Sequence, residues 1–148
     1  MQHSIEVSSY MGLAAVTLYG EVSATDRLRV LDETLERLEA DRGYGILIDL
    51  QHARATPDTF EACNRLAMRL AEEPRLRSCR VAYVYSEPGS ANPMVERLAA
   101  ARRFRFRRFL GVSEAIDWLL TPRRIRTAAK PESSAPEVLA RLRRTPGG

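Results

Sequence analysis

The chain has 148 residues, a formal net charge of +4, 45% hydrophobic residues and 28% charged residues. This length suits one domain with one hydrophobic core, and the composition is that of a globular protein. No stretch approaches the roughly 18 apolar residues that would cross a bilayer. The first residues have neither a basic start nor an apolar signal core, so we expect a cytoplasmic protein.

The positive charge is concentrated at the end of the chain. Residues 121–148 contain seven basic and two acidic residues, whereas residues 1–120 contain 16 basic and 17 acidic residues. The last segment is also rich in Arg, Ala, Pro and Ser and poor in large apolar groups. We therefore predict a folded domain at 1–120 and a flexible basic tail at 121–148. The folded part gives no general electrostatic reason to expect nucleic acid as a partner.

Cysteine and histidine are too few and too scattered to indicate a metal site. Cys63 and Cys79 fall in different predicted elements and form no Cys-x-x-Cys pair, and the histidines are His3 and His52. We expect the cysteines to be core residues of a protein in a reducing compartment. No metal and no cofactor is predicted.

The first 40 residues predict a hairpin followed by a helix. Gly12 can supply the positive φ that a tight connection between two strands needs. Ser23 and Asp26 have the spacing of a capping box at a helix start. Leucines then recur at steps of three and four residues, which is typical of an amphipathic helix. The predicted elements are strands at 3–9 and 12–19 and a helix at 24–40.

The rest of the domain alternates strands with helices. Residues 45–50 (GILIDL) are too few for a helix and apolar on both faces, which predicts a central strand buried on two sides. Asn92-Pro93 is typical of a helix start. The other predicted elements are a helix at 57–73, a strand at 80–85, a helix from 93 to about 103, a strand at 104–107 and a helix at 113–120. The order ββαβαβαβα predicts an α/β fold with a mixed five-stranded sheet covered by helices.

Several of these segments resemble the STAS, or anti-sigma-factor-antagonist-like, superfamily. They are the hairpin, Gly20-Glu21-Val22, the helix after it, the ILIDL strand with its loop and capped helix, and the closing SEAIDWL. The resemblance covers residues 3–120 and is greatest to small bacterial STAS-like proteins of unassigned function, which share their architecture with CRAL-TRIO-type lipid-binding domains. It implies a binding or regulatory module that is not an enzyme.

The resemblance also implies a candidate regulatory surface after the central strand. In the anti-sigma-antagonist branch, a phosphorylated serine starts the helix that follows this strand, and at the corresponding distance from Asp49 this chain has Thr59. The family's glycine is replaced by Phe60. The alternative is that Thr56 caps the helix and Asp58 faces its dipole, which needs no function. The candidate partner surface is Asp49, His52, Thr56, Asp58 and Thr59.

No sequence motif of an enzyme is present. There is no glycine-rich phosphate loop, no G-x-S-x-G and no H-E-x-x-H. Asp49 and His52 are the only acid and imidazole close in sequence, and their spacing in a predicted loop is poor geometry for a catalytic pair. We expect a solvated His52 and no catalysis.

An apolar stripe on the 57–73 helix allows two interpretations. Phe60, Cys63 and Leu66, with Met94 and Leu98 on the next helix, are typical of core packing. If the two helices stood apart, the same residues would line a cleft for a fatty or aromatic ligand.

Residues 102–109 (RRFRFRRF) alternate arginine with phenylalanine. The alternation predicts Phe104 and Phe106 facing the core and Arg105 and Arg107 facing outward. The candidate face for an anionic partner is Arg105, Arg107 and Arg108. Such an arginine face suits an acidic protein surface, phosphates or anionic lipid headgroups.

The leading hypothesis is a non-enzymatic module that binds a protein partner or itself through the surface at residues 51–60. The alternatives are a carrier of a small apolar ligand and, less favoured, a nucleic-acid binder that uses the arginines and the tail.

Overall fold

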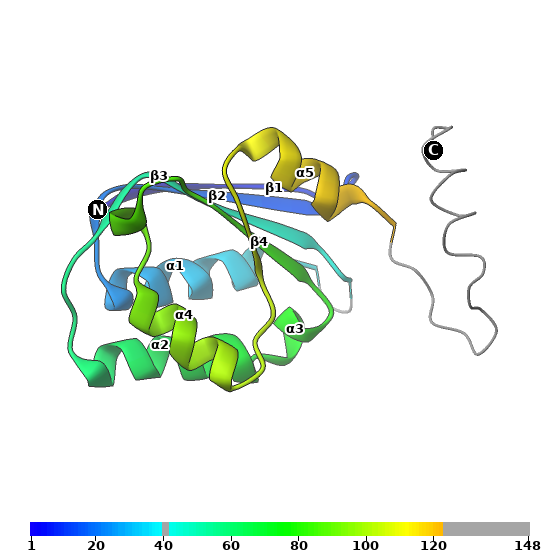
Figure 1. Ribbon diagram of the computed structural model, residues 1–148. Helices are drawn as coiled ribbons and strands as arrows, with labels where there is room; N and C mark the ends of the chain where they lie inside the picture. The colour runs from blue at the N-terminus through cyan, green and yellow to red at the C-terminus, as the bar shows by residue number, and fades with distance from the viewer. Residues whose placement is uncertain (40–41, 123–148) are drawn as a thin grey trace, which may run out of the picture.

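The structure, a computed structural model, describes residues 1–39 and 42–122 as a five-stranded sheet packed with helices (Figure 1). The predicted tail at 121–148 falls, from residue 123 onward, outside the described residues. The elements are β1 (Gln2–Ser8), β2 (Leu13–Val22), α1 (Ala24–Arg37), β3 (Gly45–Ala55), α2 (Phe60–Glu72), α3 (Pro74–Arg77), β4 (Arg80–Val84), the 3-10 turn η1 (Pro88–Ser90), α4 (Pro93–Ala101), β5 (Arg107–Phe109) and α5 (Val112–Leu120).

The strands lie in the order β1-β2-β3-β4-β5. β1 is antiparallel to β2, and every later pair is parallel. Gly12 turns the hairpin at a φ of 67°. Helices α1 to α4 lie against one face of the sheet and α5 lies against the other (Figure 1), as expected when successive crossovers of one hand advance across a sheet. The predicted α/β fold with a mixed five-stranded sheet is confirmed.

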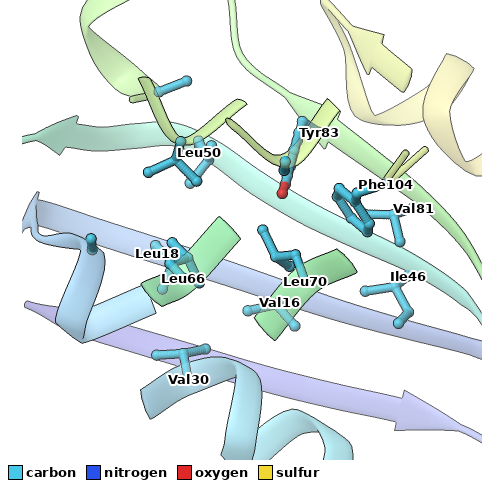
Figure 2. Packing of buried hydrophobic residues seen from close by; sticks show 14 of the residues in the cluster. Val16, Leu18, Val30, Ile46, Leu50, Leu66, Leu70, Val81, Tyr83 and Phe104 are labelled. Carbon is cyan, nitrogen blue, oxygen red and sulfur yellow. The ribbon is translucent and has the colours of Figure 1, made fainter. Parts of the chain in front are cut away.

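The central strand β3 is buried on both faces, as its apolar run predicts. Ile46 and Leu50 belong to the larger core between the sheet and helices α1, α2 and α4. Figure 2 shows these two side chains together with Leu66 and Leu70 of α2. Leu47 points the other way and packs with Ala82, Ala115 and Leu119 under α5. Each face of β3 therefore has its own apolar cluster.

The start of α1 is a capping box. The Ser23 hydroxyl accepts a hydrogen bond from the Asp26 backbone N–H at 3.0 Å, and the Asp26 carboxylate accepts one from the Ser23 N–H at 3.0 Å. Hydrogen bonds from the Arg29 side chain and the Ser23 backbone lower the pKa of Asp26. These contacts satisfy N–H groups that a helix start leaves free. The sequence prediction of this cap is confirmed.

The start of α2 differs from the prediction. The cap is Thr59, whose hydroxyl accepts from the Ala62 N–H at 3.1 Å. Thr56 stays extended because β3 runs on to Ala55, beyond the predicted end at residue 50, and the Thr56 N–H continues the pairing with Val22 at 3.0 Å. Asp58 instead accepts from the Ala24 N–H at 2.8 Å and so serves the start of α1. The assignments of Thr56 as the cap and of Asp58 to the α2 dipole were wrong.

The last strand is also displaced from its predicted position at 104–107. β5 is Arg107–Phe109, because the Phe104 N–H is bound to the Ala99 carbonyl at the end of α4 and cannot join the sheet. The directions of the rings were nevertheless right. Phe104 is buried, Phe106 packs partly against the core, and the two rings stack at 5.6 Å.

Replacing the cap of α2 tests where this helix begins. Thr59→Ala should lower the free energy of unfolding by about 1 kcal/mol, the usual value of an N-cap hydroxyl. Thr56→Ala should cost less, because the Thr56 hydroxyl lies 3.5 Å from the Val22 carbonyl, a weak contact. Urea denaturation of the two variants measures both values. A larger loss for Thr56→Ala would place the cap at Thr56.

Candidate functional site

Asp49 and His52 both lie in β3, but their side chains have different surroundings. Asp49 is buried, and its carboxylate accepts hydrogen bonds from the backbone and side-chain N–H groups of Gln51 at 3.0 and 3.1 Å. His52 is exposed and stacks on Tyr19 of β2, with 5.7 Å between the ring centroids. Between Thr17 and Tyr19 of β2 the register is irregular because β3 carries one extra residue, and Asp49 binds Gln51 at this point. The two side chains have separate structural roles, and no hydrogen bond between them occurs in the described structure.

The five residues of the predicted apolar cleft do not surround one cavity. Cys63 and Leu66 are buried in the core, and Leu98 packs partly against it. Phe60 is 59% exposed and Met94 is 41% exposed, which corrects the expectation that they face inward. Both are at the first turn of their helices, where a side chain extends past the edge of the core. The two helix starts are close together, since the Asn92 amide nitrogen lies 3.5 Å from the Cys63 sulfur.

An apolar cavity is present between the sheet and helices α1 and α2. Its volume is about 40 Å³, and Leu66 is the only residue of the predicted cleft that lines it. Ligand sites are typically about 300 to 1,000 Å³. The cavity has room for ordered water and is far too small for a fatty chain. Figure 2 shows several of its lining residues, including Val16, Ile46 and Leu70.

A polar network crosses the core beside this cavity. The Arg27 Nη2 donates to the Tyr83 hydroxyl at 3.1 Å, while the buried Arg27 Nη1 has no hydrogen-bond partner among the described residues. The Tyr85 hydroxyl donates to the Glu96 carboxylate at 3.2 Å. Burial raises the pKa of Glu96 and of both tyrosines. No sequence pattern predicted these contacts, because their members lie on α1, on β4 and the residue after it, and on α4.

A surface groove at the β4–β5 edge of the sheet has a concentrated positive charge. Its volume is about 530 Å³. Its lining includes residues of α2, α3, β4, residues 103–106 after α4, β5 and α5. β5 pairs with Ala82–Val84, so within the described residues its pairing does not extend to the first two residues of β4. We call it the arginine groove, after its lining residues Arg77, Arg80, Arg103, Arg105 and Arg107.

The predicted arginine face divides between two locations. Arg105 and Arg107 line the groove, as an outward-facing arginine surface requires. Arg108 instead lies 4.4 Å from the Tyr85 ring centroid and donates to the Tyr85 carbonyl at 3.2 Å, so it holds the end of β4. The sequence could not reveal Arg77 and Arg80 as neighbours of this face, because they come from other elements. Their convergence depends on the fold.

Two of the groove arginines also support α5. Arg80 donates to the Trp118 and Thr121 carbonyls at 2.6 and 2.9 Å, at the end of that helix. Its guanidinium lies 5.2 Å from the Trp118 ring centroid, and that of Arg107 lies 5.7 Å from it. Such cation–π contacts fix both arginines against the indole. Arg80 and Arg107 therefore form a rigid wall of the groove.

Arg103 adopts a backbone conformation that favours glycine. Its φ is 71°, and it is the one described residue other than glycine with a positive φ. The Phe104 N–H binds the Ala99 carbonyl at 3.0 Å and the Arg103 N–H binds the Ala100 carbonyl at 2.9 Å, the two bonds of a Schellman motif. Glycine is usual at this position, and another residue costs roughly 1 kcal/mol. The chain thus carries a strained arginine at the groove.

Metal-ligating residues do not gather in the described part of the chain. No group of three or more His, Cys, Asp or Glu residues there could hold a metal ion. Within the same residues, no helix has the length and apolar character needed to cross a membrane.

Comparisons with known proteins bear on the fold alone. The sequence matches no protein-family model and no curated protein. Among solved structures it is similar to an uncharacterized protein of the DUF3478 family from Shewanella loihica PV-4, described as having a SpoIIAA-like fold. The two chains are 18% identical, the similarity covers 80% of this chain and 92% of the other, and the TM-score is 0.48. The fold assignment rests on the strand order and directions given above.

The raised pKa of Glu96 predicts how stability depends on pH. Because folding makes this carboxyl harder to ionise, its favourable contribution is complete below the unfolded-state pKa and is lost as pH rises through the folded-state pKa. Glu96→Gln cannot titrate. The unfolding free energy of the wild type minus that of Glu96→Gln should therefore fall as pH rises from about 4 through the raised pKa of Glu96. Urea denaturation across this range measures it, and a difference that rises with pH would contradict the burial of Glu96.

Proposed function

We propose that this chain is a non-enzymatic binding module that recognises a protein partner, or a second copy of itself, through the exposed starts of α2 and α4. The resemblance to the STAS superfamily implies a binding role of this kind. The observation that carries the proposal is the exposure of Phe60 and Met94, two large apolar side chains in the first turns of helices whose starts lie close together. Exposed apolar groups gathered at one place are typical of a contact surface.

The surface extends along α2. Met68 is two helical turns beyond Phe60 and is 37% exposed. Asn64 lies between them on the same side, and its amide nitrogen is 3.7 Å from the Met68 sulfur. An unbranched methionine adapts to different partner shapes, which suits a recognition surface. We call Phe60, Met68 and Met94 the apolar edge.

One polar residue of the predicted partner surface adjoins the apolar edge, since Thr59 is exposed next to Phe60. His52 is also exposed, but it stacks on Tyr19 of β2. The hydroxyl of Thr59 is accessible although it caps α2, so a phosphate there would meet the favourable end of the helix dipole. The two carboxylates of the predicted surface have local structural roles, because Asp58 accepts from the Ala24 N–H and Asp49 accepts from the Gln51 N–H.

The other two candidate functions have less support. A carrier of a fatty ligand would need a larger cavity than the one of about 40 Å³ in the core. A protein that grips single-stranded nucleic acid needs aromatic faces on which bases can stack. Here Phe106 packs against Phe104 and Tyr83, and Trp118 packs against Phe109 and two arginines.

Site-specific photo-crosslinking in the native host tests the proposed surface. A photoreactive phenylalanine at position 60 should give a discrete protein adduct, and Met94→Glu in the same chain should abolish it. Position 10 is the matched control, because Tyr10 is 96% exposed in the turn between β1 and β2. The same set of crosslinked proteins from positions 60 and 10, or no adduct from position 60, would contradict the proposal.

A further inference from the structure

We propose that the arginine groove is a binding site for small anions that carry two or more linked phosphate groups. The proposal is independent of the protein-binding surface at the starts of α2 and α4.

The first argument is uncompensated charge. The side chains of Arg77, Arg103 and Arg105 make no hydrogen bond or ion pair with any described residue, and no carboxylate lines the groove. Arg107 adds a further positive charge beside Trp118. Residues 1–120 have slightly more acidic than basic residues, so this convergence is local. Like charges gathered in a concave site attract anions.

The second argument is the chemistry of the donors. A guanidinium presents paired N–H donors that match two oxygens of one phosphate group. Four such groups, those of Arg77, Arg103, Arg105 and Arg107, exceed what a single phosphate can use. The volume of about 530 Å³ falls in the range of small-molecule sites. A ligand with several linked phosphates fits the number of donors and the space.

The third argument concerns the aromatic residues of the groove. Phe104 is buried, Phe106 packs against Phe104 and Tyr83, and two guanidiniums lie near the Trp118 ring. These rings form the floor of the groove and hold arginines in position. They do not offer free faces to a base, so the recognised feature is the phosphate chain.

The fourth argument is the backbone of Arg103. This residue occupies the glycine position of the Schellman motif at the end of α4. Strain retained beside a ligand-sized groove indicates that the side chain is used there. Glycine at this position would relieve the strain and remove one guanidinium from the groove.

Isothermal titration of the full chain with inorganic tripolyphosphate at low salt tests the proposal. Arg105→Gln should raise the dissociation constant by about tenfold or more, since a hydrogen-bonded charge contact is lost. Arg102→Gln is the matched control, because Arg102 is exposed, carries the same charge and lies outside the groove lining. It should change the constant by less than about twofold. Both variants keep the basic tail, so binding by the tail would be the same in each.

Arg103→Gly provides a second test that separates binding from folding. This variant should weaken tripolyphosphate binding by about tenfold while its urea midpoint stays equal to or rises above that of the wild type. Unchanged affinity in Arg103→Gly and Arg105→Gln would overturn the proposal, as would equal losses in Arg105→Gln and Arg102→Gln. Orthophosphate binding as tightly as tripolyphosphate would also contradict it, because linked phosphates would then have no role.

Two further titrations distinguish other sources of phosphate. Vesicles of phosphatidylcholine with a phosphorylated phosphoinositide present phosphates on a membrane, and a single-stranded oligouridylate presents them on a polymer. Tripolyphosphate should bind more tightly per phosphate than either. Preferential binding of the vesicles or the oligonucleotide that Arg105→Gln abolishes would overturn the assignment to a small free ligand.

Discussion

The burial of β3 on both faces is the constraint on which the rest of the structure depends. A strand with apolar side chains on both sides must be covered twice. Helices α1 to α4 cover one face, and α5 at the end of the domain covers the other (Figure 1). At Gly45 an added Cβ would lie 2.9 Å from the Leu119 Cβ, so the start of β3 has a glycine where α5 comes closest. Without α5, Leu47 and its neighbours would face water.

The two proposed binding surfaces, the apolar edge and the arginine groove, lie at opposite ends of the sheet. β3 and β4 are parallel, so the carboxyl end of β3, which leads to α2, lies away from the first residues of β4. The apolar edge is therefore at the former end, and the arginine groove is at the latter. The groove lies where the chain leaves α4, pairs only three residues of β5 with β4 and then continues to α5. A module arranged in this way could hold a protein partner and a small anion at once.

The sequence predicted the features that depend on local periodicity. The hairpin, the capping box at Ser23 and the Asn92 cap of α4 all follow from short-range patterns, and the structure confirms them. The apolar run at residues 45–50 likewise predicted the buried centre of the sheet. The start of α2 was misplaced because the pairing of β3 with β2 beyond Leu50 involves polar residues that carry no strand signal. Phe60 appeared to belong to the core because its spacing fits the stripe, while its position in the first turn leaves it exposed. The sequence predicted only Arg105 and Arg107 of the groove, because Arg77 and Arg80 come near them only in the folded structure.

Native-state hydrogen exchange of the full chain tests most directly whether the doubly covered β3 is the centre of stability, with the proposed binding surfaces at its periphery. The backbone amides of Ile46 to Leu50 should exchange only through global unfolding, with the free energy that urea denaturation gives. The amides of residues 105 and 106, in the segment that crosses the groove, should exchange through smaller openings. Amides of β3 that exchange as fast as those of the groove segment would contradict the account.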